Sequence, residues 1–162
     1  MNDIARTDAD WMRYTLEEAR RALAHDDVPV GAVAVLNGEV IGVGWNQREA
    51  EQDPTAHAEM IAIRQAAKHI GRWRLDDVTL YCTLEPCTMC AGAMVLARLP
   101  RLVYATDDPK AGAAGSILDI LNHPQLNHHV DVTRMTGPLA EEAAELLREF
   151  FRSLRAQGKN GR

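Results

Sequence analysis

The sequence has 162 residues, a mass of 17.9 kDa, 46% hydrophobic residues and 25% charged residues. This size and apolar content support a domain with its own core and exclude a disordered tail, a collagen-like fibre and a crosslinked mini-protein. The net charge of -5 means that a nucleic-acid partner would have to bind a local basic patch. We expect a single domain over residues 1–162, with a basic helix end and tail over about 153–162.

Targeting signals are not evident in this sequence. No apolar run approaches the roughly 20 residues that a membrane-crossing helix needs. The first six residues do not show the basic and then apolar pattern of a signal peptide. Three cysteines are an odd number, and two of them are three residues apart, which argues against a disulfide framework. We therefore expect a cytoplasmic protein with no membrane partner.

The first third of the chain predicts a helix followed by a hairpin. Asp8 is a candidate cap for a helix that runs to about residue 25, with apolar residues at helical spacing. Residues 31–36 are apolar throughout, as in a strand that is covered on both faces. Asn37-Gly38 tolerates positive φ at both turn positions and leads into a second strand over 40–45.

The middle of the chain predicts a polar loop, a buried helix and a strand. The loop covers residues 46–54, and Thr55 is a candidate N-cap for the helix over 56–70. Gly71 ends that helix because glycine accepts the left-handed conformation at a helix C-terminus. A third strand is expected over residues 78–83.

The last part alternates helices and strands. Pro86 suits the first turn of a helix over about 87–97. The remaining elements are a strand over 102–105, a Gly-rich loop over 107–116, a short helix or turn over 117–121, a strand over 130–135 and a helix over 139–156. Helices interleaved with strands indicate an α/β fold, and we expect a three-layer α/β/α sandwich with a mixed sheet of about five strands.

Two cysteines have the spacing of metal ligands. Cys87 and Cys90 share one face of a helix's first turn. The helix dipole and the free N–H groups there favour thiolates, which are the form that binds zinc. The pair alone also suits redox chemistry, or two buried cysteines that act as small apolar side chains.

A histidine and a glutamate stand at the start of the preceding helix. His57 and Glu59 would point about 200° apart in a regular helix, so they can serve one centre only where the helix opens. Thr55 as the cap would place them there. Taken alone, His57 could be a hydrogen-bonded core residue and Glu59 a carboxylate favoured by the helix dipole.

Together the two segments predict a catalytic zinc site. They supply one imidazole and two thiolates, and three protein ligands leave a fourth tetrahedral position for water. Zinc lowers the pKa of that water towards ~7, and Glu59 is then the natural proton shuttle. This His-x-Glu and Pro-Cys-x-x-Cys pattern is the known signature of zinc nucleobase deaminases. Cys82 is expected to be a buried apolar filler and not a fourth ligand.

The chain resembles the bacterial tRNA-specific adenosine deaminases of the cytidine deaminase-like superfamily over about residues 9–155. The motifs that carry the resemblance are Pro29-Val30-Gly31-Ala32-Val33, Gly44-Trp45-Asn46, residues 53–59, residues 83–94, residues 108–116 and Asn127-His128. The resemblance implies hydrolytic deamination of the wobble adenosine of a tRNA anticodon to inosine. Zinc-bound hydroxide would attack purine carbon 6, and one Zn²⁺ would be held per subunit of a homodimer.

The resemblance also implies residue roles. Metal ligands would be His57, Cys87 and Cys90, with Glu59 as the catalytic proton shuttle. Asn46 would hydrogen-bond the flipped base, and further substrate contacts would come from Asp107, Asp108 and Lys110. Two more substrate contacts, Phe150 and Arg152, are expected from the composition of the last helix. Without the resemblance, Asn46 is a turn residue and the two aspartates are loop caps. His123, His128 and His129 have irregular spacing, which favours loop or capping roles over a second metal site.

The last helix carries a basic stripe that suits RNA. Its members Arg148, Arg152, Arg155 and Lys159 follow helical spacing, with Phe150 and Phe151 between them. Basic groups and aromatic rings are what single-stranded RNA recognition uses, although a solvated charged face with a core phenylalanine has the same pattern.

Two alternative functions stay open. A free-base or nucleoside deaminase of the guanine or cytosine type would keep the zinc chemistry and would tolerate removal of residues 153–162. A non-enzymatic, zinc-stabilised RNA-binding module would have no use for an unligated Glu59 beside an open coordination position.

Overall fold

The structure is a computed structural model that describes residues 5–159. Residues 1–4, which carry part of the prediction about a signal peptide, and residues 160–162 of the expected basic tail lie outside this described part. The helical elements are α1 (Asp8–Arg20), η1 (Arg21–His25), α2 (Arg48–Glu51), α3 (Ala58–Ile70), α4 (Thr88–Leu96) and α5 (Pro138–Ala156). The strands are β1 (Gly31–Leu36), β2 (Glu39–Trp45), β3 (Thr79–Leu84), β4 (Arg101–Thr106) and β5 (Asp131–Arg134).

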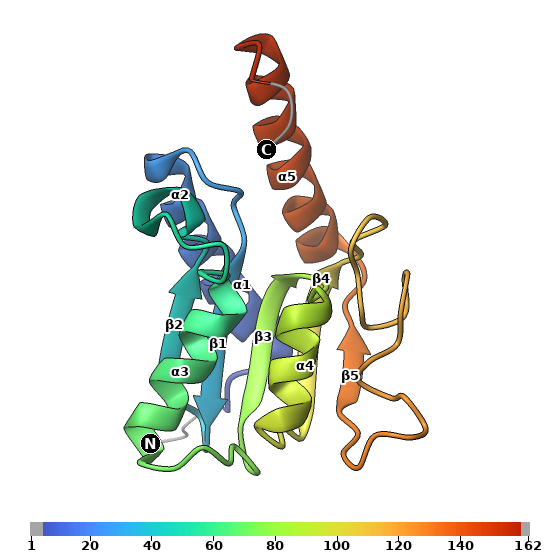
Figure 1. Ribbon diagram of the computed structural model, residues 1–162. Helices are drawn as coiled ribbons and strands as arrows, with labels where there is room; N and C mark the ends of the chain where they lie inside the picture. Colours follow the sequence, from blue (N-terminus) through green and yellow to red (C-terminus); the bar gives the residue numbers. More distant parts are fainter. Residues whose placement is uncertain (1–4, 160–162) are drawn as a thin grey trace.

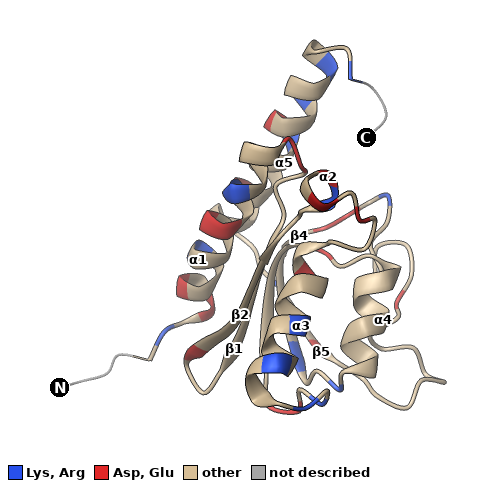
Figure 2. Ribbon diagram, turned by 60° about the vertical axis from the view of Figure 1, so that its left-hand side comes forward, with Lys and Arg blue, Asp and Glu red and all other residues tan. Residues whose placement is uncertain are grey.

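The five strands form one mixed sheet in the order β2-β1-β3-β4-β5. β1 is antiparallel to both β2 and β3, whereas β3, β4 and β5 are parallel. Helices α1 and α5 cover one face of the sheet, and α3 and α4 cover the other (Figures 1 and 2). This arrangement confirms the prediction of a three-layer α/β/α sandwich with a mixed sheet.

The topology brings three strand ends to one edge of the sheet. Because β2 and β3 are both antiparallel to β1, β2 points the same way as β3 and β4. The chain leaves these strands at Asn46, Glu85 and Asp107, respectively. Ligand sites in open α/β sheets form outside the carboxyl ends of strands, so these positions are candidates for one site. The starts of α3 and α4 lie at the same edge (Figure 1).

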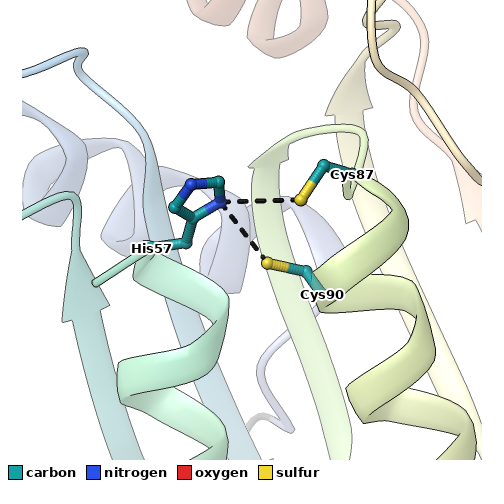
Figure 3. Close-up of side chains that lie close together, drawn as sticks. All are labelled: His57, Cys87 and Cys90. Atoms are coloured by element: carbon teal, nitrogen blue, oxygen red, sulfur yellow. Dashed lines mark hydrogen bonds between the residues drawn. The ribbon is translucent and has the colours of Figure 1, made fainter. Parts of the chain in front are cut away.

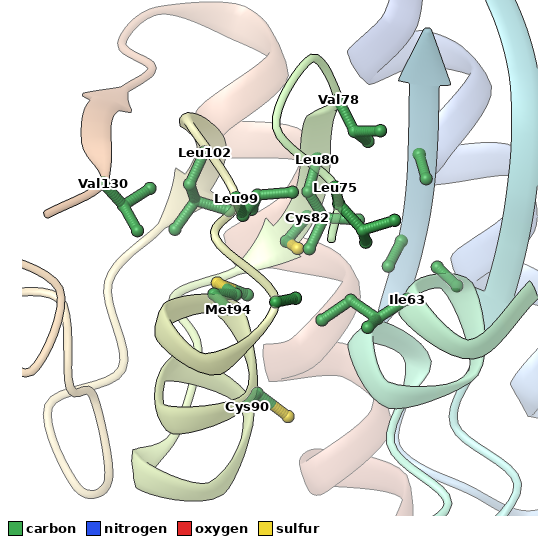
Figure 4. Close-up of a cluster of buried hydrophobic side chains, with 14 of the residues drawn as sticks. Ile63, Leu75, Val78, Leu80, Cys82, Cys90, Met94, Leu99, Leu102 and Val130 are labelled. Carbon is green, nitrogen blue, oxygen red and sulfur yellow. The ribbon is translucent and has the colours of Figure 1, made fainter. Parts of the chain in front are cut away.

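A hydrophobic core on each face holds the layers together. Ala62, Leu80, Met94 and Leu102 belong to the core beneath α3 and α4, part of which is drawn in Figure 4. The core beneath α1 and α5 includes Trp11, Met12, Leu16, Val33 and Val103. Burial of large apolar side chains contributes about 1.5–3 kcal/mol each, and both layers are built mainly in this way.

A glycine in β2 lets α3 approach the sheet closely. A Cβ at Gly44 would lie 2.1 Å from the carbonyl oxygen of Ala58, the first residue of α3. No side chain fits in that space, so the start of α3 lies directly on the end of β2. This contact places His57, the residue before α3, beside the strand end that carries Asn46.

The hairpin and most helix ends agree with the prediction from sequence. Asn37 and Gly38 have φ values of 51° and 79°, as the predicted turn requires. Gly71 ends α3 with a φ of 80°. The predicted helix over 8–25 is α-helical only to Arg20 and continues as the 3₁₀ helix η1, which ends at Asp26 with a φ of 54°.

Two caps were wrongly predicted. Thr7, and not Asp8, caps α1, because Thr7 and Asp10 form a reciprocal capping box. Asp8 instead accepts hydrogen bonds from the Tyr81 hydroxyl at 2.8 Å and from Arg101 at 2.6 and 2.9 Å. Thr55 does not cap α3, because its N–H and hydroxyl both donate to Asp53 Oδ1 at 2.7 Å.

Smaller differences concern the loops. The predicted loop over 46–54 contains the four-residue helix α2. Of the short helix or turn predicted over residues 117–121, no helix forms; these residues contain a bend, a turn and an isolated bridge between Ala114 and Asp119. Pro86 precedes α4 and does not lie in its first turn, because α4 begins at Thr88.

Candidate metal centre and active site

His57 and Cys87 both occupy the cap position of a helix. His57 is the N-cap of α3 with extended dihedrals (φ -78°, ψ 149°), and Cys87 is the N-cap of α4 (φ -74°, ψ 176°). Neither side chain caps its own helix by a hydrogen bond, so both are free to turn toward each other. The prediction that His57 lies where its helix opens is therefore confirmed, although the cap is His57 itself.

The three predicted ligands come together. His57 Nδ1 lies 3.6 Å from Cys87 Sγ and 3.6 Å from Cys90 Sγ (Figure 3). The three candidate ligand atoms all lie within 4.8 Å of one another. A tetrahedral zinc with a Zn–N bond of about 2.05 Å and a Zn–S bond of about 2.3 Å separates N and S by about 3.6 Å. The spacing and the donor set both fit zinc.

The electrostatics of the two thiols differ. A hydrogen bond with Cys90 lowers the pKa of Cys87 to about 3, and the neighbouring His57 acts in the same direction. The pKa of Cys90 is raised by that hydrogen bond to Cys87 and by burial. Without a metal ion, the protein therefore favours a thiolate at Cys87 and a thiol at Cys90. A divalent cation bound to both sulfurs would favour the second thiolate, because metal binding releases thiol protons.

Glu59 is buried beside this cluster without a full set of partners. It is 3% exposed, and its Oε2 atom has no hydrogen-bond partner among the residues that the structure describes. Burial raises the pKa of Glu59 to about 7, while the neighbouring His57 opposes the shift. A buried carboxyl with an unsatisfied oxygen costs free energy, so its presence beside the candidate metal ligands points to a chemical role.

Asn46 lies against the start of α3. It is 6% exposed, and its Oδ1 atom accepts a hydrogen bond from the Ala58 backbone N–H at 3.0 Å. Within the described part of the chain, nothing accepts a hydrogen bond from its Nδ2 group. The side chain is thus held by one end, with its two amide protons available to a ligand.

The other predicted substrate residues of this edge lie on the loop after β4. Asp107 accepts hydrogen bonds from Arg134 Nε at 2.7 Å and from the Tyr104 hydroxyl at 3.1 Å, and the Arg134 bond lowers the pKa of Asp107. Asp108 Oδ1 accepts from the N–H groups of Lys110 and Ala111 and so shapes the turn. The Lys110 residue is exposed.

The last helix projects beyond the same edge of the sheet (Figure 1). Acidic and basic residues both lie along α5 (Figure 2), and ion pairs between them partly neutralise the basic stripe. Arg148 pairs with Glu145 at 2.8 Å, and Arg152 approaches the same carboxylate at 3.6 Å. Lys159 approaches Asp26 at 3.8 Å, whereas Arg155 forms no ion pair with any described residue.

The two phenylalanines of α5 differ in exposure. Phe150 is 9% exposed and lines a hollow with Leu23 and Leu154, whereas Phe151 is half-buried and contacts Phe150 edge-on at 5.4 Å. The structure leaves Phe150 little surface to offer RNA. The predicted contact through Phe150 is therefore less favoured by this arrangement than a contact through Phe151.

Residues that sequence reasoning did not single out also surround the site. Asp27 has no exposed side-chain surface and accepts hydrogen bonds from the N–H groups of Val28 and Glu49, with Arg48 Nη2 at 3.4 Å. Glu85 is another buried carboxylate, directly before Pro86. Glu85 lies within the motif of residues 83–94, where its own signal is a charge at the end of an apolar strand, whereas Asp27 stands in a polar turn.

Cys82, His128 and His129 make contacts within the core or the loops. Cys82 is fully buried in the core, and burial raises its pKa well above the ordinary value, so a thiolate ligand there is disfavoured. His128 bonds the Leu99 carbonyl at 2.7 Å, and His129 bonds the His123 carbonyl at 3.1 Å.

No helix of residues 5–159 is both long enough and apolar enough to cross a bilayer.

Comparison with known proteins gives consistent matches. Residues 6–155 match the MafB19-like deaminase family. The tRNA-specific adenosine deaminase of Bacillus subtilis (strain 168) is 45% identical over 152 residues, which cover 94% of this chain and 93% of the relative. That of Haemophilus influenzae is 48% identical over 153 residues, covering 94% and 87% of the two chains.

Solved structures agree with this result. A structure from a study of A-to-I editing by tRNA:A34 deaminases at the wobble position superimposes with a TM-score of 0.81 at 45% identity, covering 86% of this chain and 99% of that one. The guanine deaminase of Nitrosomonas europaea gives a TM-score of 0.75 at 26% identity, covering 91% and 85%. The chain therefore belongs to the MafB19-like deaminases and, within them, to the tRNA-specific adenosine deaminases.

Proposed function

We propose that this protein hydrolyses the wobble adenosine of a tRNA anticodon to inosine and ammonia, with one zinc ion per chain. The observation that carries the proposal is the cluster of His57, Cys87 and Cys90 beside a buried Glu59 with an unpaired oxygen. The identity of 45–48% to tRNA-specific adenosine deaminases over nearly the whole chain supports the substrate.

The three clustered side chains would hold the zinc ion. When bound, zinc supplies a Lewis acid that makes hydroxide available near neutral pH. The N–H groups at the starts of α3 and α4 favour negative charge on these ligands. His57 would offer its Nδ1 atom to the metal, because this atom faces both sulfurs.

Glu59 would move the protons of the reaction. Its Oε2 atom has no other partner, so it is available to take a proton from the attacking water. The carboxyl would then deliver that proton to the purine ring nitrogen. It would next take the proton of the hydroxyl group added at carbon 6 and pass it to the amino group, which leaves as ammonia while carbon 6 becomes a carbonyl. Burial raises the pKa of Glu59, which favours its protonated form, and a proton shuttle must hold a proton for part of its cycle.

Asn46 and the loop after β4 would hold the substrate. The Asn46 amide group faces no described acceptor and would donate to the flipped base, while Oδ1 stays fixed to the backbone of α3. Asp107, Asp108 and Lys110 would contact the neighbouring nucleotides. On α5 we propose contacts from Arg152, Arg155 and the more exposed Phe151. Base flipping costs less free energy in an anticodon loop than in a duplex, because the bases of the loop are already unpaired.

The assembly and location follow from the same proposal. A homodimer in the cytoplasm, with the anticodon loop received at the subunit interface, stays a prediction. A free-base deaminase is the second candidate, favoured by the similarity to the guanine deaminase of Nitrosomonas europaea. The identity of 26% to that enzyme, against 45% for the A34 deaminase structure, favours the RNA substrate.

A deamination assay with a panel of substrates tests the proposal. Zinc-loaded protein is offered an anticodon stem-loop with a wobble adenosine, the same stem-loop with guanosine there, and free adenosine, cytidine, cytosine and guanine. We expect inosine only in the adenosine stem-loop. Turnover of a free base or nucleoside, with the stem-loop untouched, would keep the metal site and overturn the RNA assignment. No turnover of any substrate by a zinc-loaded chain would favour a non-enzymatic zinc module.

A further inference from the structure

The connection from β3 to α4 contains a carboxylate with an unusually complete set of partners. Glu85 is 1% exposed. Its Oε1 accepts hydrogen bonds from the backbone N–H groups of Ala114 and Ser116, both at 3.0 Å. Its Oε2 accepts from the Asp108 N–H at 2.9 Å and from the Ser116 hydroxyl. A carboxylate offers about four lone-pair sites, and all four are used here.

All four donors belong to the loop that follows β4. Two backbone hydrogen bonds flank them: the Glu85 N–H donates to the Thr106 carbonyl, and the Ala113 N–H donates to the Pro86 carbonyl, both at 2.8 Å. No cation of the described residues forms an ion pair with Glu85. Neutral donors of this loop therefore provide all the described hydrogen-bond stabilisation of this buried charge, which ties loop and carboxylate to each other.

The loop approaches Glu85 so closely that only glycine fits at one position. A Cβ at Gly112 would lie 2.4 Å from Glu85 Cδ and 2.6 Å from the Asp108 carbonyl oxygen. The backbone at Gly112 thus packs directly on the carboxylate. Cys87, a ligand of the candidate metal centre, is only two residues after Glu85 along the chain.

We infer that Glu85 is a positioning residue for the RNA substrate. It fastens residues 107–116, which include Asp107, Asp108 and Lys110, at a fixed place beside the metal-binding start of α4. Glu85 itself is buried and touches no substrate. This inference rests on the proposed function, in which the loop contacts the nucleotides next to the wobble adenosine.

The substitution Glu85→Gln isolates this role because it keeps the shape and removes acceptors. If the new amide nitrogen faces the Ser116 hydroxyl, that hydroxyl can accept from it, but the Asp108 N–H loses its acceptor. If the amide is turned the other way, two backbone N–H groups lose theirs. Either orientation releases part of the loop and leaves the three metal ligands in place.

The test compares the zinc-loaded wild type with Glu85→Gln, Ser116→Ala and the control Val103→Ala. Val103 is buried in the core beneath α1 and α5, on the other face of the sheet, so its variant reports general destabilisation. The readouts are zinc content, hydrogen exchange of the amides in residues 108–116, and kcat and KM for the anticodon stem-loop. Hydrogen exchange needs no substrate and reads the loop directly.

We expect Glu85→Gln to keep one zinc per chain, to lose protection at the Asp108, Ala114 or Ser116 amides, and to raise KM about tenfold with kcat within about threefold. Ser116→Ala, which removes one hydroxyl donor only, should raise KM about twofold and covers the case in which Glu85→Gln does not fold. Val103→Ala should change neither the loop exchange nor KM.

Three results would overturn the inference: unchanged exchange in residues 108–116, an unchanged KM despite faster exchange, or an equal rise of KM in Val103→Ala. If Glu85→Gln does not fold, an unchanged KM in Ser116→Ala has the same meaning. A wild type that leaves the stem-loop untouched would instead overturn the proposed function, and hydrogen exchange would still decide whether Glu85 holds the loop.

Discussion

The start of α3 and the connection from β3 to α4 each bury one glutamate at the same edge of the sheet, and the two are treated in opposite ways. Glu59 is 3% exposed and has an oxygen without a partner, whereas Glu85 is 1% exposed and accepts four hydrogen bonds. An unsatisfied buried carboxylate costs stability, and a fully satisfied one rigidifies its surroundings. The two glutamates are buried to a similar degree and differ in their hydrogen-bond partners. The unpartnered oxygen of Glu59 is available for catalysis, whereas the four hydrogen bonds of Glu85 hold the neighbouring loop in place.

The largest effect is expected at the unpartnered carboxylate. Glu59→Gln should lower kcat on the stem-loop by about 10²–10⁴-fold, because the amide cannot carry protons between water, base and leaving group. Zinc content should stay at one per chain, measured by metal analysis. Glu18→Gln is the matched control, since Glu18 is a mostly buried glutamate on α1 that pairs with Arg21. An active Glu59→Gln would remove the assigned role.

The second largest effect is expected at Gly112, in the loop that packs on Glu85. Gly112→Ala forces a Cβ to within 2.4 Å of the carboxylate carbon, so the loop must shift. We expect a loss of about 1–3 kcal/mol in unfolding free energy, as for overpacked sites, and a rise in KM. Gly92→Ala is the control, because a Cβ there meets nothing within 4 Å and alanine favours the helix. Thermal unfolding and kinetics measure the stability and the KM of both variants. Equal stability and equal KM in Gly112→Ala and Gly92→Ala would contradict the close packing of Gly112 on Glu85.

The contrast between partnered and free groups extends to α5. Arg155 has no ion pair among the described residues, while Arg148 is held by Glu145. Arg155→Gln should weaken stem-loop binding several-fold, because one phosphate contact is lost. The slope of the logarithm of the binding constant against the logarithm of the salt concentration should become shallower by about one. Arg148→Gln should change binding less. Titrations between about 50 and 200 mM salt measure both slopes, and identical slopes for the two variants would argue against a distinct role for Arg155.

A partnered carboxylate far from the site should affect stability alone. The Arg101 guanidinium beside Asp8 lowers the pKa of that carboxyl, with the Tyr81 hydroxyl adding to the effect. A lowered pKa in the folded state gives stability that is present above the unfolded value of 3.8 and is lost as pH falls through the folded value. Asp8→Asn should therefore cost about 1 kcal/mol at pH 7 and less near pH 2, which lies below the unfolded value, a modest figure because the pair is partly exposed. Urea unfolding at both pH values checks this, and a cost that does not change with pH would refute the linkage.

The smallest effect is expected at the third cysteine. Cys82 is fully buried, and Cys82→Val is close in size, so we expect unchanged zinc content and unchanged turnover. Loss of either would make Cys82 part of the site. Metal analysis with a stem-loop assay on the same preparation decides between these results.

The sequence contains strong signals for the metal centre and weak ones for what surrounds it. His57, Cys87 and Cys90 could be assigned because one imidazole and two thiolates at helix starts form a rare combination, and the structure brings them within 4.8 Å. The hairpin was predictable because Asn37-Gly38 has few other uses. Glu85 could not be assigned a role, because its four donors come from residues 23–31 positions away in the chain.

The wrongly predicted caps have the same origin. Thr55 is a good capping residue by type, but Asp53 two residues earlier accepts its N–H and hydroxyl first. Asp8 is likewise drawn to Tyr81 and Arg101, which lie 73 and 93 positions away. Local propensity states what a side chain can bind, and the tertiary structure decides which partner is nearest.

The central claim is that Glu59 transfers protons and that Glu85 positions the loop which binds the substrate. Single-turnover kinetics with wild type, Glu59→Gln and Glu85→Gln, using one zinc-loaded preparation of each, test it most directly. Measuring the rate at increasing enzyme concentration separates the maximal deamination rate of the wobble adenosine from the dissociation constant of the stem-loop. Glu59→Gln should lose at least about 100-fold in maximal rate with nearly unchanged binding. Glu85→Gln should bind more weakly, with a maximal rate within a few-fold of wild type. The same defect in both variants would contradict the account.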